Sequence, residues 1–131
     1  ANNISDYTVN QNLGTGNNVS FNAVSDVAGN LRDVPQNAKS AAYTLVSADA
    51  GKHVSITTGG VTVPASVFSA GQVITVYNNA AASQTITQGA SVTMYLAGTA
   101  TTGNRTLAQR GLATILCVAA NTFVISGSGV S

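Results

Sequence analysis

The chain has 131 residues, which is enough for one domain with an appended arm. Only 7% of the residues are charged and the net charge is +1, whereas a typical soluble domain has roughly 25% charged residues. The basic residues are few and scattered, and no apolar run approaches the roughly 20 residues of a membrane span, so we expect neither nucleic acid nor a membrane as a partner.

The first 39 residues are rich in asparagine and carry widely spaced apolar side chains, with a V-x-x-N-L pattern at residues 9–13 and again at 27–31. Such a segment cannot bury enough apolar surface alone to offset its ordering entropy. We therefore predict that residues 1–39 form an extended N-terminal arm with short strands that lies against the body, sister chains or another protein. The arm side chains expected to make these contacts are Ile4, Tyr7, Val9, Leu13, Val19 and Phe21.

Residues 40–131 form the predicted body, where short segments alternate between apolar and polar residues. In the segment 53–57, for example, Val54 and Ile56 alternate with polar side chains. Turn-forming Gly, Asn and Pro separate such segments at intervals of roughly 8–12 residues, which is the rhythm of a β-sandwich or small barrel. The predicted strands are residues 53–57, 61–63, 72–77, 85–87, 92–96, 112–118 and 122–126.

The last two predicted strands differ from the others in composition and spacing. Residues 112–118 are almost continuously apolar, which indicates a central strand buried on both sides. The short turn 119–121 joins them to residues 122–126 and predicts a hairpin. Together the patterns predict an all-β fold: an antiparallel β-sandwich or small barrel, jelly-roll-like, with an extended N-terminal arm.

Candidate catalytic and metal-binding residues are isolated from one another. His53 is the only histidine and Cys117 the only cysteine, so neither a catalytic dyad nor a metal cluster is expected, and Cys117 reads as a buried small apolar residue. Asp49 is the only acid of the body, whereas glycoside hydrolysis normally needs two carboxyl groups. We therefore predict no enzymatic activity, no cofactor and no metal ion. The other acids are Asp6, Asp26 and Asp33.

Two arginines stand close together in a chain that is poor in charge. Arg105 and Arg110 flank residues 106–109, and no acid is near them in the sequence. They are either solvated loop residues or anchors to a partner protein, because arginine is favoured in interfaces. We therefore predict Arg105 and Arg110 as candidate interaction residues of the body.

From about Asn30 to its end the chain resembles a module of virion proteins of tailed bacteriophages, especially marine and cyanobacterial phages. The resembling segments are residues 30–37, 42–45, 50–57, 60–64, 96–108 and 123–130, of which 96–108 (LAGTATTGNRTLA) is the strongest. The resemblance implies an all-β domain of tail fibres and capsid-surface proteins, commonly trimeric. It implies no catalytic residues.

An arm of about 40 residues with a body of about 90 suits a capsid decoration, or cement, protein if the chain is whole. The expected partners are the major capsid protein or another virion protein and further copies of the chain as a homotrimer, in a virion assembled in the host cytoplasm. Low charge also favours self-association, since little repulsion separates the copies. A short tail-fibre or tail-tip protein with a role in binding host glycans is the alternative, although the chain has no Trp to stack on sugars.

Overall fold

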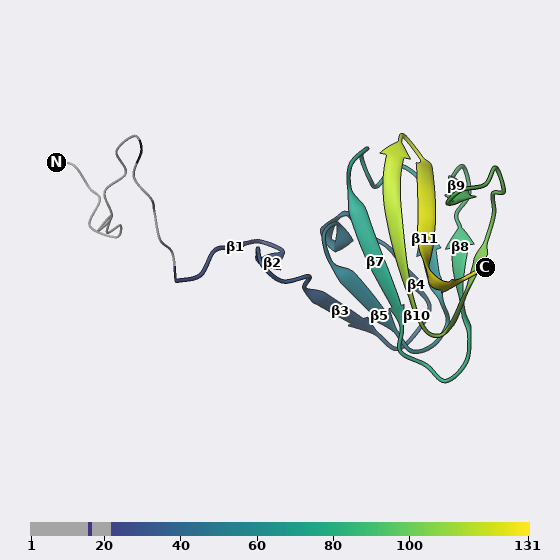
Figure 1. Ribbon diagram of the computed structural model, residues 1–131, viewed down its shortest axis with the longest axis horizontal. Coiled ribbons are helices and arrows are strands. Elements are labelled where there is room, and N and C mark those ends of the chain that lie inside the picture. The colour runs from purple at the N-terminus through teal and green to yellow at the C-terminus, as the bar shows by residue number, and fades with distance from the viewer. Residues whose placement is uncertain (1–15, 17–21) are drawn as a thin grey trace.

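The computed structural model describes Gly16 and residues 22–131, and almost all regular structure in this part of the chain is β-strand. Figure 1 shows a small hairpin, β1–β2, outside a body in which the remaining strands curl around one core. None of the described residues belongs to a helix long and apolar enough to span a bilayer. The elements are β1 (Ser25–Asp26), β2 (Gly29–Asn30), β3 (Gln36–Lys39), β4 (Tyr43–Thr44), the 3-10 turn η1 (Ser47–Asp49), β5 (His53–Ile56), β6 (Val61–Val63), β7 (Val73–Asn78), β8 (Gln84–Gln88), β9 (Thr93–Leu96), β10 (Arg105–Ala119) and β11 (Thr122–Val130).

Strands β3 to β8 alternate between two walls as the chain advances. On the first wall β3, β5 and β7 lie side by side and parallel, and on the second wall β4, β6 and β8 do the same. Each coil of chain thus contributes one strand to each wall. Because a complete coil returns the chain to the same wall in the same direction, neighbouring strands of one wall must be parallel.

The long strand β10 joins the two walls. Its beginning, Arg105 to Leu107, pairs antiparallel with β8 of the second wall, and its later part, Leu112 to Leu116, pairs antiparallel with β7 of the first. The register shifts between Leu107 and Leu112, where Arg110 has a φ of 59°. β11 folds back along β10 as an antiparallel hairpin, and β9 lies parallel to β11. The last three strands therefore complete a nearly closed barrel.

The all-β sandwich or small barrel is confirmed, and so is the hairpin formed by β10 and β11. The antiparallel expectation was wrong for β3 to β8 and for the pair β9 and β11, because these strands are parallel. Period-two alternation tells which side chains share a face but carries no information about strand direction. The edge strand β3 lies within the segment 1–39 that the sequence assigns to the arm, and it pairs with β5 of the body.

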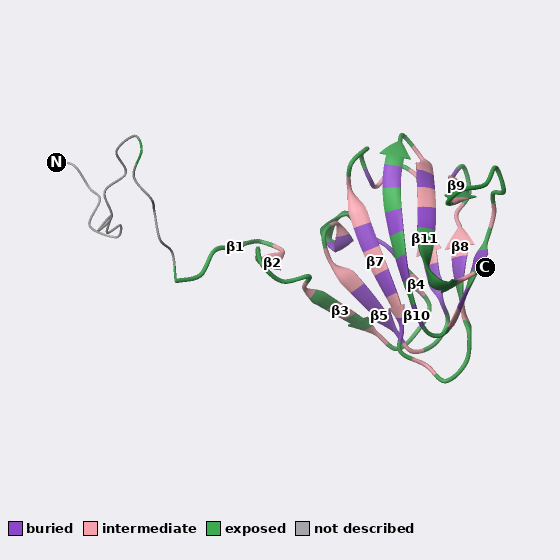
Figure 2. Cartoon of the chain, viewed as in Figure 1, coloured by how far each residue is buried: buried purple, intermediate pink, exposed green. Residues whose placement is uncertain are grey.

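The core lies between the two walls and is built almost entirely from aliphatic side chains, with one edge-to-face pair of aromatic rings, Phe68 and Phe123, 6.2 Å between centroids. Along β10 only alternate residues are buried, as the banding in Figure 2 shows. The prediction that this strand is buried on both sides was therefore wrong. The largest fully buried side chains are Phe123, Leu45, Ile56, Ile74, Ile86, Met94, Leu107, Ile115 and Ile125.

A recurring turn precedes four strands of the body. An alanine is followed by a residue with positive φ two positions before β5, β7 and β9 begin and one position before β11 begins, at Gly51 (77°), Gly71 (94°), Ser91 (62°) and Asn121 (55°). Glycine adopts this left-handed conformation without steric cost, and asparagine tolerates it better than most residues. The first three of these positions are evenly spaced in the sequence. The structure thus reveals an internal repeat in the body.

Candidate interaction surface

The outward side of the sheet formed by β7, β10 and β11 is not covered by any described segment. We call this surface the outer face. Its rows are set by the strand register: Leu112 lies opposite Tyr77 on one side and Ser128 on the other, and the rows of Thr114 and Leu116 follow. The members of the outer face are Val73, Thr75, Tyr77, Leu112, Thr114, Leu116, Val118, Val124, Ser126 and Ser128.

The outer face is uncharged and partly apolar. None of its members carries a formal charge, and the side chains of Leu112, Leu116 and Val118 are 50%, 37% and 44% exposed. A shallow hollow of about 510 Å³ lies beside Leu112, where β7 and β10 meet His53 and Val34. A contiguous exposed apolar patch with a polar surround is typical of a protein or ligand interaction site. Chemically, this surface can bind an uncharged partner by burying aliphatic side chains.

Arg110 lies beside the outer face on the exposed side of β10. Its guanidinium donates hydrogen bonds to the Tyr77 hydroxyl at 3.3 Å and to the Asn79 side-chain oxygen. The residue is exposed, so it can meet a partner, but its own chain already holds its side chain in place.

Arg105 lies on the opposite, inward side of β10. Its side chain is only 8% exposed, and its neighbours in the register are Ile86 on β8 and, two residues along β10, Leu107. The structure therefore does not bring the two candidate arginines into one site. Arg105 is also the one residue of the described chain whose buried side-chain nitrogens, Nε and Nη2, have no hydrogen-bond partner.

The single histidine and the single cysteine of the sequence both lie on strands of the body. His53 lies on β5 with its Nδ1 2.8 Å from the Val34 carbonyl oxygen. Cys117 is fully buried on β10, and this burial raises the pKa of its thiol. Within the described residues no cluster of three metal-ligating side chains occurs.

Asp49 is buried at the end of η1 and holds the first coil together. Its carboxylate accepts hydrogen bonds from Asn37 Nδ2 at 2.7 Å, from the Tyr43 hydroxyl at 2.9 Å and from the Val46 backbone N–H at 2.8 Å. Burial and the hydrogen bond to Asp49 raise the pKa of Tyr43. The single acid of the body is thus engaged in folding contacts.

The predicted arm contacts Ile4, Tyr7, Val9, Leu13, Val19 and Phe21 lie outside the described residues. The described part of the arm exposes Val27 in the β1–β2 hairpin and Leu31 and Val34 after it. Val27 and Leu31 are the first and last residues of the second V-x-x-N-L pattern. This pattern could have identified them as further candidate contact residues of the arm.

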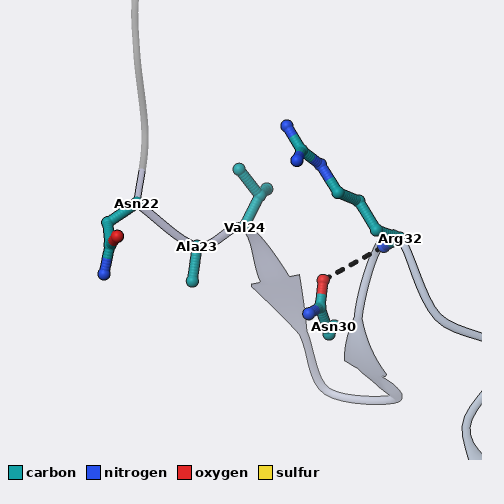
Figure 3. Close-up of a pocket in the computed structure, with 5 residues that line it drawn as sticks. All are labelled: Asn22, Ala23, Val24, Asn30 and Arg32. Carbon is teal, nitrogen blue, oxygen red and sulfur yellow. Dashed lines mark hydrogen bonds between the residues drawn. The ribbon is translucent and has the colours of Figure 1, made fainter.

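A small hollow lies beside the same hairpin (Figure 3). Its lining consists of Asn22, Ala23, Val24, Asn30 and Arg32, and the Arg32 backbone N–H donates to the Asn30 side chain at 3.1 Å. All of these residues are exposed, and the Arg32 guanidinium extends away from Asn30. The hollow therefore offers no buried group that would define a ligand.

Comparisons with protein-family models, with curated proteins and with solved structures find no match to this chain.

Proposed function

We propose that the protein is a structural component of a tailed-bacteriophage particle, a capsid decoration protein that works by binding other protein chains. Its partners are the major capsid protein or another virion protein and further copies of itself, as a trimer. The virion assignment rests on the resemblance of residues 30–131 to phage virion modules. The observation that supports binding of protein chains is the outer face, with its uncharged surface and its half-exposed Leu112 and Leu116.

The outer face suits association with protein better than exposure to water. Burying a whole leucine side chain is worth about 1.5–3 kcal/mol, so covering a half-exposed leucine is worth about 1 kcal/mol. Covering this face would require no charge to lose its hydration, since none of its members is charged. In the same proposal the arm attaches the body to the shell and to sister chains, with Val27 and Leu31 among its contact residues.

The test is a double substitution, Leu112→Ser with Leu116→Ser, measured by light scattering across a concentration series and by incorporation into particles. We expect self-association about 30-fold weaker and reduced incorporation, because about 2 kcal/mol of burial is lost. The matched control is Val46→Ser, which alters a side chain of similar exposure, 47%, outside this face. Unchanged association of the double variant would show that the outer face is not the contact.

A second candidate function is that of a short tail-fibre or tail-tip protein that binds host glycans. The hollow beside Leu112 supports it, because Tyr77 can stack on a sugar ring while Thr75 and Thr114 supply hydroxyl groups. Labelling of intact particles separates the two functions: decoration gives signal over the head, and a fibre gives signal at the tail. For the fibre, Tyr77→Ala should also abolish saturable adsorption to host cells.

A further inference from the structure

Arg105 presents a charge inside the protein with no partner for part of its guanidinium. It begins β10 on the inward side, in register with the buried Ile86, and more than nine-tenths of the residue is covered. Its Nε and Nη2 atoms are buried and have no hydrogen-bond acceptor. A buried cation without a partner is strongly unfavourable, so such a group calls for a specific explanation.

No acidic side chain in the described part of the chain pairs with this guanidinium. Asp26 and Asp33 are exposed in and after the β1–β2 hairpin, and both carboxylate oxygens of Asp49 are occupied by donors elsewhere. The nearby amide oxygens are engaged too. Gln88 Oε1 accepts from the Met94 and Gly103 backbone N–H groups, and Asn104 Oδ1 accepts from the Gln88 N–H.

The two unpartnered atoms define which ligand would fit. Nε–H and Nη2–H lie on the same edge of the planar guanidinium and point in parallel, so together they match two oxygens of one carboxylate or phosphate group. We propose that Arg105 is a binding site for an oxyanion, a carboxylate or a phosphate, which belongs to another molecule and accepts hydrogen bonds from Nε and Nη2 together. The site would stabilise the second wall where β10 meets β8.

Arg110 provides the internal comparison. It is the same residue type on the same strand, but it is exposed and already donates to Tyr77 and Asn79. An effect of general ionic strength would act on both arginines. A built oxyanion site would depend on Arg105 alone.

The test is thermal unfolding of the full chain in formate or phosphate, with chloride as the balancing anion at constant ionic strength. We expect the wild-type melting temperature to rise with the logarithm of the anion concentration, and to be higher by about 5 °C or more once the anion exceeds its dissociation constant tenfold. Arg105→Lys keeps the charge but lacks the fork and should lose the rise, whereas Arg110→Lys should keep it. Arg105→Met, an apolar replacement for the buried charge, serves if the lysine variant does not fold, and it should be insensitive to the anion.

A second readout follows the arginine Nε–H resonances by NMR during the same titrations. The Arg105 signal should shift with saturation, and a response to formate alone or to phosphate alone would identify a carboxylate or a phosphate. An equal response to chloride would overturn the proposal, since a spherical ion needs no fork. So would the absence of any saturable shift. A fall in melting temperature on Asp6→Asn that formate restores would also overturn it, because the oxyanion would then belong to the chain itself.

Discussion

Replacing Asp49 by asparagine tests what the only acid of the body does. The substitution keeps the size of the side chain but removes its charge and one of its two acceptor oxygens. In the structure three donors converge on this carboxylate: Asn37 Nδ2, the Tyr43 hydroxyl and the Val46 N–H. An amide cannot accept all three in the same geometry, and its own NH₂ group would face at least one of them.

The expected loss follows from the number and kind of these hydrogen bonds. A hydrogen bond to a charged group contributes about 1.5–3 kcal/mol, and a buried donor left without a partner costs about 1–3 kcal/mol. Asp49 is 1% exposed, so water does not readily replace the missing acceptor. Asparagine retains part of the network, and we expect unfolding to become easier by about 2–3 kcal/mol.

Urea unfolding at pH 7 measures this loss, with an unchanged m-value showing that the same surface is exposed. The matched control is Asp33→Asn, the same chemical change at an exposed position, which should stay within about 0.5 kcal/mol of wild type. A change of less than about 1 kcal/mol for Asp49→Asn would refute the reasoning that this network holds the first coil together.

Two further predictions concern Tyr43 and the arm. Because the pKa of Tyr43 is raised above its usual 10.0, the folded state binds more protons than the unfolded state above pH 10, so stability should fall as the pH rises there. In urea unfolding between pH 9 and 11, the free energy of unfolding of Tyr43→Phe should fall less steeply with pH than that of wild type. The contribution of Cys117 is the same in both proteins and cancels in the comparison. An identical slope in the two proteins would contradict the assignment to Tyr43. Deleting residues 1–30 should abolish incorporation into particles and leave the body folded by circular dichroism. Full occupancy by the truncated protein would argue against attachment through the arm.

The positions of most strands could be predicted from the sequence, whereas their directions could not. Alternation located β5, β6, β7, β8, β9 and β11 to within two residues at most boundaries, except at the C-terminal end of β11. The exceptions in the body are the two-residue strand β4, which was not predicted, and β10, which starts at Arg105 because the polar and small residues around Arg110 interrupt the apolar pattern. The alanine turns at Gly51, Gly71 and Ser91 are evenly spaced in the sequence, and this spacing could have predicted that the chain coils between the two walls. Evenly spaced turns before every second strand indicate that the chain coils regularly, and hence that neighbouring strands of one wall, such as β5 and β7, are parallel.

The sequence also contains a pattern that predicts the different orientations of Arg105 and Arg110. Extending the alternation of residues 112–118 back along the strand places Arg105 in phase with Ile115 and Arg110 in phase with Leu112. The first arginine is therefore inward and the second outward. The hydrogen bonds that hold Arg110, and the lack of partners at Arg105, depend on segments distant in sequence, and alternation cannot reveal them.

The wrong prediction for β10 bears on function. Its apolar residues predicted burial on both sides, yet only one side packs into the core and the other carries Leu112, Leu116 and Val118 on the surface. A strand exposed to water on one side would ordinarily carry polar residues there. A local sequence pattern that disagrees with the fold of the single chain is expected at a functional site, because residues there are selected for function as well as for folding. Two-sided apolar character in β10 is therefore consistent with a strand whose second side is covered by another protein chain, as the proposed decoration function requires.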